Sequence, residues 1–263
     1  MNIEIPIPRE LFTAFNDVTF FNEPHKYYVD NKQLISVTTL IHEYQEDFDE
    51  KYWSEYKGNQ YNLPPKEILR AWKYINKKGT IKGSAIHDYA ENLFQNKKFE
   101  YPLRLILDEF GFDPVINEYN TTKKHVDQFY TDVQGKLIPI RTEFVIFDRE
   151  SLIGGMLDML FYNVKWGVFQ IYDWKTNKDF THEMKSRHLL KDLYLLEDCD
   201  MELYSLQLEM YKQIIQRNTS LKLGKSYIVW FSHNNPTYKV IETKNREFYV
   251  NKILDNRLAE LIA

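Results

Sequence analysis

The feature that most constrains the fold is a pair of apolar, β-rich runs that follow each other closely, each with a carboxylate. The first run covers residues 155–162 and holds Asp158 among hydrophobic neighbours. The second covers residues 168–175 and closes with Asp173 and Lys175 on either side of a tryptophan. Because side chains two positions apart in a strand point to the same face, Asp173 and Lys175 should project together from one side of a sheet. If the two runs pair as a hairpin, Asp158 can reach the same place.

Two carboxylates and an ammonium group on an apolar sheet are costly unless they are compensated, because buried charges are normally paired or bound to a metal. A magnesium or manganese ion suits this cluster, since these ions prefer oxygen ligands and keep positions for water and for a phosphate. A simpler interpretation also stays open. Asp173 and Lys175 would then end a strand at the surface and form only a salt bridge, as an acid and a base at this spacing often occur by chance.

Five short sequence elements stand in a fixed order between residues 83 and 211. They are a histidine-bearing segment at 83–91, Glu143, the pair Gly155 and Asp158, the run Asp173-Trp174-Lys175-Thr176, and a Q-x-x-x-Y motif from Gln207 to Tyr211. Together they resemble the core of the PD-(D/E)XK nuclease superfamily, in its RecB-like branch. The resemblance implies an α/β fold, with a mixed central β-sheet flanked by helices in a restriction-endonuclease-like core. It also implies a metal-dependent nuclease.

Each residue that matches the family takes a role from this resemblance. Asp158 and Asp173 would hold the metal ion. The backbone carbonyl of Trp174 and a nitrogen of His87 would add to its ligands. Lys175 would contact the attacking water and the phosphate, and so stabilise hydroxide as it forms. Whether one ion or two take part is left open.

Glu143 and the Q-x-x-x-Y motif are placed near the same centre by the resemblance. Glu143 would sit close to the active site, although a salt bridge with Arg141 or Arg149 on the strand face is an alternative. Gln207 and Tyr211 lie four positions apart in an expected helix and therefore share a face. They would position the DNA strand or the ligands rather than take part in the chemistry.

The histidine-bearing segment predicts a helix that begins at Ser84, after a break at residues 77–80. His87 and Glu91 lie four positions apart on this helix and share a face. A lone histidine beside an apolar stripe is often a packed core residue, and that alternative applies to His87. The resemblance instead places His87 at the metal ion and Glu91 beside it, where Glu91 would help to position the DNA.

The net charge of −4 argues mildly against a passive nucleic-acid coat protein, which is usually basic. A nuclease needs only a local basic groove to hold phosphates. Basic residues stand just before the histidine-bearing helix and just after the run that ends in Lys175: Lys73, Lys77, Lys78, Lys82, Lys178, Lys185, Arg187 and Lys191. We assign Lys82 and Lys178 to DNA binding, with ordinary solvated faces as the alternative for this group.

The rest of the chain predicts one folded unit of 263 residues, with an N-terminal elaboration at 1–80 and a catalytic core at 81–263. A hairpin or small meander is expected at 17–35, and Ser36 resembles the N-cap of a short helix. Other expected elements are helical pieces between 47 and 78 broken at 62–65, helices at 122–133, 203–215 and 245–262, and strands at 140–147 and 223–231. Four aromatic residues of the helical pieces are expected in the core, with base stacking as the alternative: Trp53, Tyr56, Trp72 and Tyr74.

Composition limits the class of protein. Hydrophobic residues make up 43% of the chain and aromatic residues 16%, which excludes a disordered chain and supplies a sizeable core. No apolar run reaches the length of a membrane span and the N-terminus lacks signal-peptide features, so we expect a soluble, cytoplasmic protein without a membrane partner. The single cysteine, Cys199, excludes an internal disulfide and the four-cysteine iron–sulfur cluster that several RecB-like nucleases carry.

The resemblance leads to the hypothesis of a Mg²⁺- or Mn²⁺-dependent deoxyribonuclease, in the first place an exonuclease. Its substrate would be single- or double-stranded DNA with ends. Stand-alone phage exonucleases and mitochondrial genome-maintenance exonucleases are similar, which indicates work in DNA replication, recombination or repair. A replication or recombination protein is then a plausible partner. Polarity of digestion, strand preference and oligomeric state are left open by the sequence.

Three alternatives to the exonuclease stay open. A structure-specific or defence endonuclease would use the same fold. A non-catalytic DNA-binding module would have a broken metal site, whereas Asp158, Asp173 and Lys175 are all present. An unrelated α/β protein with a chance motif would gain no thermal stability from magnesium or manganese. RNA is the less favoured substrate because no base-stacking RNA motif is found.

Overall fold

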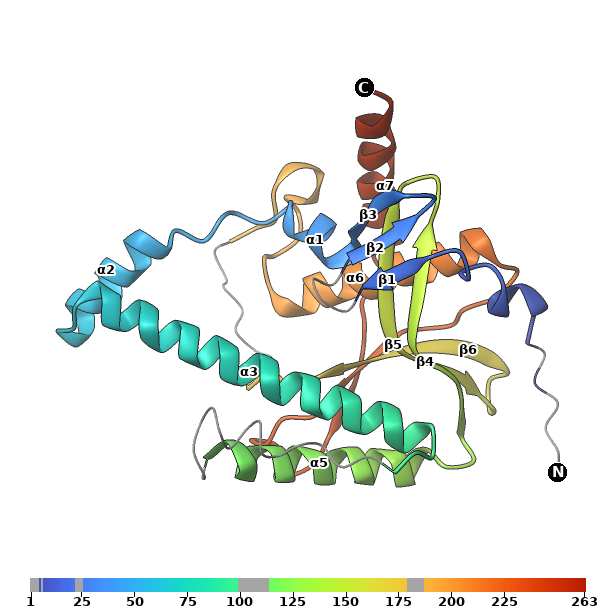
Figure 1. Ribbon diagram of the computed structural model, residues 1–263, viewed down its shortest axis with the longest axis horizontal. Helices are drawn as coiled ribbons and strands as arrows, with labels where there is room; N and C mark the ends of the chain where they lie inside the picture. Colours follow the sequence, from blue (N-terminus) through green and yellow to red (C-terminus); the bar gives the residue numbers. More distant parts are fainter. Residues whose placement is uncertain (1–4, 6, 22–25, 99–113, 179–186) are drawn as a thin grey trace.

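A mixed β-sheet with helices on both faces forms the centre of the protein, as the sequence predicts (Figure 1). It is seen in a computed structural model that describes residues 5, 7–21, 26–98, 114–178 and 187–263. The middle strands are β4 (Leu137–Asp148), β5 (Ile153–Asn163) and β6 (Val168–Lys175), each antiparallel to the next. Burial along almost all of β5 and β6 explains why their sequences are continuous apolar runs rather than alternating ones.

Three short strands extend the sheet on the N-terminal side. β1 (Thr19–Phe21), β2 (Lys26–Val29) and β3 (Lys32–Ser36) form an antiparallel meander, as expected. Asp30 and Asn31 have positive φ angles of 50° and 61°, the backbone that a tight two-residue hairpin turn requires. β3 then runs parallel to the first residues of β5. The other turn expected in this region, at residues 22–24, lies outside the described residues.

Two further strands extend the sheet beyond β6. β7 (Tyr227–Trp230) runs parallel to β6, and β8 (Lys239–Glu242) runs antiparallel to β7. The strand expected at 223–231 is therefore shorter than predicted. Its first residues do not join the ladder, because Leu223 makes only an isolated parallel bridge with Phe169.

Helices cover both faces of the sheet. α1 (Val37–His42), α6 (Asp200–Asn218) and α7 (Glu247–Ile262) lie on one face, and α3 (Pro65–Phe94) and α5 (Pro114–Val133) lie on the other. Two 3₁₀ turns, η1 (Arg9–Phe12) and η2 (Lys191–Leu193), complete the described elements. Ser36 is the N-cap of α1, as predicted, because its hydroxyl oxygen accepts a hydrogen bond from the backbone N–H of Thr39 at 3.0 Å.

The hydrophobic core has two parts, one on each face of the sheet. The part under α6 and α7 is mainly aliphatic, while the part under α3 and α5 is rich in aromatic rings: Phe94, Phe129, Phe161, Trp174 and Phe231. Side chains of β6 alternate between them, so Ile171 faces the first part and Trp174 the second. Asp173 and Lys175 share the parity of Ile171, and this places them on the α6 face.

Helix α3 differs from the prediction. The sequence predicts a break at 77–80 and a new helix at Ser84, but α3 is one helix of 30 residues. The prediction is wrong because Gly79 costs only about 1 kcal/mol relative to alanine inside a helix, and α3 is held by contacts with both α2 and α5. The boundary expected at residue 80 therefore falls within a single helix.

α2 (Glu50–Tyr61) and the first turns of α3 form an arm that projects from the sheet (Figure 1). The predicted break between these helices is confirmed, because Asn62 ends α2 with a φ of 54° and Pro65 begins α3. Core burial is wrong for Tyr56 and Tyr74, which are 52% and 49% exposed, since no sheet lies beneath the arm. None of the described helices has the length and apolar character that crossing a membrane requires.

Candidate active site

Strand β5 has one short stretch that lacks a described partner strand on one of its two edges, and the candidate active site is built there. β4 occupies one edge of β5 along its whole length. The other edge pairs with β3 at its first two residues and with β6 from Met159 onward, so residues 155–158 have no partner there among the described strands. Asp158 spans the gap, because its Oδ2 accepts a hydrogen bond from the backbone N–H of Trp174 at 2.6 Å. The carboxylate replaces the missing ladder bond and is fixed in position.

Three adjacent strands each bring one carboxylate to this gap. The ladder pairs on either side set Glu143 of β4 opposite Asp158 of β5, and the β5–β6 register continues from there to Asp173 of β6. Residues opposite each other on neighbouring strands have Cβ atoms about 5 Å apart. Asp158 and Asp173 are 8% and 2% exposed, so these acids are held close together away from water.

Asp173 and Lys175 project together, as the strand spacing predicts. The Nζ of Lys175 lies 2.6 Å from Oδ2 of Asp173, and the ammonium stands over the ring of Tyr204 at 4.5 Å from its centroid. The two side chains therefore do form the salt bridge of the simpler interpretation. That interpretation is wrong in placing the pair at the surface, because the Lys175 side chain is only 17% exposed and that of Asp173 only 3%.

Helix α3 brings His87 to the same carboxylates from the other side. Its Nδ1 lies 3.4 Å from Oδ1 of Asp158, and its Nε2 lies 3.1 Å from the backbone oxygen of Trp174. His87, Glu143 and Asp158 each offer one ligand atom within 4.8 Å of the other two. The structure therefore assembles the histidine, the carbonyl and the acids that the family resemblance names, while their roles stay predictions.

Burial and mutual charge shift the pKa values of these groups. Burial, with the neighbouring Asp158 charge, raises the pKa of Glu143 to about 8, and burial raises that of Asp173 to about 6. Burial alone would lower the pKa of His87, but Asp158 raises it to about 9; burial would raise the pKa of Asp158, but His87 lowers it. Without a cation, the cluster thus holds an ionised His87–Asp158 pair beside a protonated Glu143 at neutral pH.

The donor set fits a divalent cation. Oε1 of Glu143 is buried and has no hydrogen-bond partner among the described residues, and the backbone of Glu143 has a φ of 43°. A buried unpaired oxygen costs about 1–3 kcal/mol, and such a backbone costs a similar amount. The salt bridge with Arg141 or Arg149 is not formed, because Arg149 pairs with Asp17 at 2.9 Å and Arg141 stacks on aromatic rings. A hard cation would give this oxygen a partner.

Gln207 and Tyr211 approach the acids from α6. The side-chain amide of Gln207 donates a hydrogen bond to the Tyr211 hydroxyl at 3.0 Å. Burial, and then the charge of Asp173, raise the pKa of Tyr211 far above its ordinary value. The ring lies against Gly155, where a Cβ would come within 2.5 Å of Cε1. Glycine is therefore required at this position for the tyrosine to stand beside the gap in β5.

Two residues of the site are missing from the sequence prediction. Tyr204 lies under the Lys175 ammonium, and the side-chain amide of Asn177 donates hydrogen bonds of 2.8 Å to the Tyr204 hydroxyl and to Asp200. A signal for Tyr204 exists, because it precedes Gln207 by three positions on α6 and so shares its face. Asn177 has no comparable signal beyond its position two residues after Lys175.

Glu91 lies behind the cluster rather than in it. Its Oε1 accepts hydrogen bonds from the Gln95 side chain at 2.8 Å and from the Thr142 hydroxyl at 3.4 Å. Thr142 precedes Glu143 in β4, so the Glu91 charge adds to the raised pKa of Glu143 after burial and Asp158. The contact of Glu91 with DNA stays a prediction.

The predicted groove lysines are placed differently from one another. Lys82 is 6% exposed and forms an ion pair with Glu118 of α5 at 3.1 Å, so it does not lie on an open surface. Lys178 is exposed and follows the end of β6. Arg187 pairs with two acids at 3.5 and 3.6 Å, and Lys185 lies outside the described residues. Contact of these side chains with DNA stays a prediction.

Comparison with known proteins adds little. No protein-family model matches the sequence, and no curated protein matches it. A solved structure of a candidate exonuclease from Eubacterium rectale is 13% identical, with a TM-score of 0.41, over 68% of this chain and 65% of that one. Another, of SSO0001, is 13% identical with a TM-score of 0.30, over 70% and 88%. Identities and TM-scores this low support no statement about function, and this chain spans less than two thirds of the first protein. The function is therefore inferred from the candidate site.

Proposed function

We propose that the protein is a metal-dependent deoxyribonuclease that hydrolyses phosphodiester bonds, acting as an exonuclease on DNA with ends. The observation that carries the proposal is the convergence of three carboxylates, an imidazole and an ammonium group at one gap in the sheet. Oε1 of Glu143 in that cluster is buried and has no hydrogen-bond partner among the described residues, which supports a role as a cation ligand.

The chain's own residues would hold the ion and order the reacting groups. Glu143 and Asp158 offer carboxylate oxygens and His87 a nitrogen, with Asp173 and the Trp174 carbonyl beside them. A bound Mg²⁺ or Mn²⁺ supplies charge neutralisation for the phosphate and lowers the pKa of a bound water. Fixed second partners, such as the Trp174 N–H on Asp158, keep the donors in place without reorganisation.

Lys175 is placed to stabilise developing negative charge on the water or the phosphate. Burial disfavours its charged form, but the Asp173 carboxylate raises its pKa above the ordinary value, so it stays an ammonium at neutral pH. Its position is set by Asp173 on one side and the Tyr204 ring on the other. A fixed positive charge in a water-poor site stabilises a transition state because it need not reorganise during the reaction.

The exonuclease activity and its setting are supported by the family resemblance of the sequence. We propose that residues 1–263 act as one intracellular nuclease unit in DNA replication, recombination or repair, of a phage or genome-maintenance type. A replication or recombination protein would recruit it to its substrate. The second candidate, a structure-specific or defence endonuclease, would use the same residues. A non-catalytic DNA-binding module is disfavoured because Asp158, Asp173 and Lys175 are all present and lie in one cluster.

A cleavage assay on end-labelled linear and covalently closed circular DNA tests this proposal. It compares Mg²⁺, Mn²⁺ and chelator for the wild type, Lys175→Met, and the matched control Lys222→Met. Lys222 is exposed and precedes the bridge from Leu223 to Phe169, at the far end of β6 from Lys175. We expect metal-dependent loss of linear DNA alone in the wild type and the control, and none in Lys175→Met. Loss of circular DNA favours the endonuclease, and no cleavage of either refutes the nuclease.

A further inference from the structure

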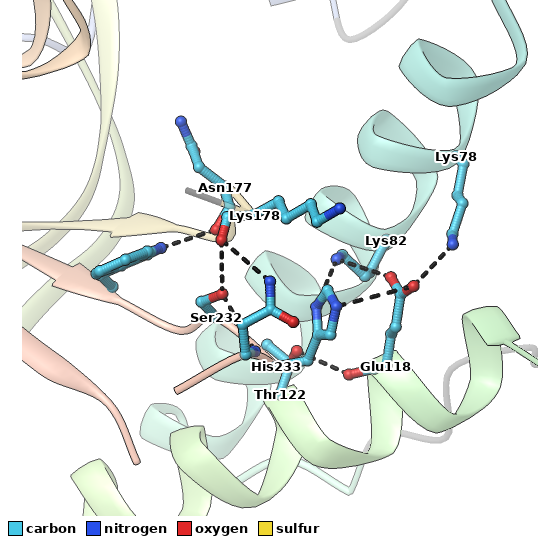
Figure 2. Close-up of polar contacts among 10 residues, drawn as sticks. Lys78, Lys82, Glu118, Thr122, Asn177, Lys178, Ser232 and His233 are labelled. Atoms are coloured by element: carbon cyan, nitrogen blue, oxygen red, sulfur yellow. Dashed lines mark hydrogen bonds and ion pairs between the residues drawn. The ribbon is translucent and has the colours of Figure 1, made fainter. Parts of the chain in front are cut away.

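A charged cavity lies between α3, α5 and the ends of β6 and β7, and its lining begins at Thr176, the residue after Lys175 (Figure 2). Its volume is about 620 Å³, and the described residues of its lining include Lys78, Lys82, Lys178, His233 and one acid, Glu118. The space is large enough for a phosphate group with part of its nucleotide. None of the roles proposed above for metal binding or hydrolysis uses it.

Glu118 stands among more positive charge than it can neutralise. Its Oε1 lies 2.8 Å from the Nζ of Lys78, and its Oε2 lies 3.1 Å from the Nζ of Lys82. His233 completes the group, with Nδ1 3.4 Å from Lys82 and Nε2 3.8 Å from Glu118. One carboxylate therefore faces two ammonium groups, which leaves a positive charge on the cavity wall even with a neutral imidazole. Burial, and then Lys82, lower the pKa of His233, so it faces the cavity as a neutral hydrogen-bonding group.

Lys178 adds a third ammonium group from the opposite wall. Its side chain extends from the end of β6 toward α3, and its Nζ makes no ion pair or hydrogen bond with any described residue (Figure 2). Its backbone is held firmly, because the carbonyl oxygen accepts hydrogen bonds from Ser232 and Asn234 at 3.3 Å each. Trp230 donates a further bond to the preceding carbonyl, of Asn177, at 2.8 Å. A fixed backbone with a free ammonium is suited to receive an anion.

The end of β6 and helix α3 each contribute residues both to the cavity and to the cluster of acids. Lys178 follows Lys175 by three residues, about 10 Å along an extended chain. Lys82 precedes His87 by five residues, about 8 Å along helix α3. Successive nucleotides of a strand in duplex DNA rise by about 3.4 Å. A strand whose cleaved bond lies at the acids therefore brings another phosphate to the cavity within about three nucleotides.

We infer that this cavity binds a phosphate group of the substrate strand next to the bond that is cut. The inference rests on the proposed nuclease function and names a subsite for its substrate. Lys178 and Lys78 provide the charges, and Lys82 and His233 form the buried end of the cavity. The phosphate is either the terminal one of a DNA end or an internal one of the chain. A terminal phosphate would make the cavity a sensor of strand ends.

Binding measured without turnover tests the cavity apart from the chemistry. Fluorescence anisotropy in chelator uses duplexes whose 5′ or 3′ ends carry either a phosphate or a hydroxyl group. The proteins are the wild type, Lys178→Met, Lys78→Met and the control Lys222→Met, with thermal melts to verify folding. Lys178 is the best probe, because its ammonium group makes no ion pair or hydrogen bond with the part of the chain that the structure describes. We expect each pocket variant to weaken binding about 5- to 20-fold, with the control unchanged. The slope of the logarithm of affinity against the logarithm of salt concentration should become shallower by about one in these variants.

The ends of the duplex distinguish the two sources of phosphate. If the cavity holds a terminal phosphate, removing it weakens the wild type and has no further effect on Lys178→Met. If it holds an internal phosphate, the end group does not matter and Lys178→Met weakens every duplex alike. Pocket variants that bind all duplexes like Lys222→Met, or a wild type that binds no duplex, overturn the inference. Cleavage lost in Lys175→Met but unchanged in such pocket variants would leave the nuclease proposal standing alone.

Discussion

Replacing Gly155 with alanine should disturb the candidate active site through the ring of Tyr211. A Cβ at residue 155 would lie 2.5 Å from Cε1 of that ring and 3.3 Å from Cδ1 and Cζ. Carbon atoms in contact normally stay about 3.5–4.0 Å apart, so the ring must move by about 1 Å. Because Tyr211 is only 3% exposed, its neighbours must move too. Overpacking of this kind costs about 1–3 kcal/mol of the free energy of unfolding.

The displaced ring would also lose the hydrogen bond that Gln207 donates at 3.0 Å. We therefore expect Gly155→Ala to lower the cleavage rate together with stability. Urea unfolding followed by circular dichroism measures the free energy. Gly79→Ala is the matched control, because a Cβ there meets nothing within 4 Å. Alanine in that helix should stabilise the protein by up to about 1 kcal/mol, the opposite sign.

A second substitution tests whether the ring is the cause. Tyr211→Leu removes Cε1, the atom that a Cβ at residue 155 would approach most closely, and also Cζ. In the double variant the cost of Gly155→Ala should fall by about 1 kcal/mol or more, since residues in contact are not additive. If Gly155→Ala were as stable as the wild type, or its cost the same in both backgrounds, the close approach of ring and strand would not exist as described.

Lys175→Met should abolish cleavage yet bind DNA in chelator within about twofold of the wild type, since Asp173 neutralises its ammonium group at 2.6 Å and the metal-free cluster has no excess positive charge; near-normal cleavage would rule out its role. The affinity for Mn²⁺ should rise by up to about a hundredfold per pH unit between about pH 6 and 8, because the ion displaces the protons of Glu143 and His87, whose pKa values are about 8 and 9. Calorimetry in buffers of different ionisation enthalpy counts these protons, and a pH-independent affinity would contradict the coupling. Glu202→Gln should cost about 1–3 kcal/mol of the free energy of unfolding at pH 7. Burial raises the pKa of Glu202, but hydrogen bonds from two basic side chains lower it below the ordinary 4.5, so this stabilisation is complete above 4.5 and is lost as the pH falls through the lowered pKa. Urea titrations across this range measure it, and a constant difference would refute the ion-pair origin.

Contacts set by local geometry could be predicted from the sequence. Asp173 and Lys175 meet because the side-chain period of a strand is fixed by its backbone, and Ser36 caps α1 for an equally local reason. Glu143 is different. Its place opposite Asp158 depends on the register of β4 and β5, and its positive φ depends on surroundings that no neighbouring residue specifies.

Long-range packing explains the features that were mispredicted or missed. Lys82 was expected in a basic groove, but Glu118, which is 36 residues away in the sequence, pairs with it in the interior. Tyr204 meets Lys175 only because α6 lies across the end of β6. Gly79 is a helix breaker by local propensity, and the packing of α3 against α2 and α5 overrides that propensity.

Because α3 is one continuous helix, it connects the exposed arm directly to the candidate active site. From Pro65 at the exposed arm to His87 at the acids, the helix spans 22 residues, about 33 Å. The first turns of this 30-residue helix belong to the arm, and His87 lies in its second half. Helix α5 packs along its side. A displacement of the arm that moved α3 as a rigid body would therefore also change the position of His87 relative to Asp158, which lies 3.4 Å from it.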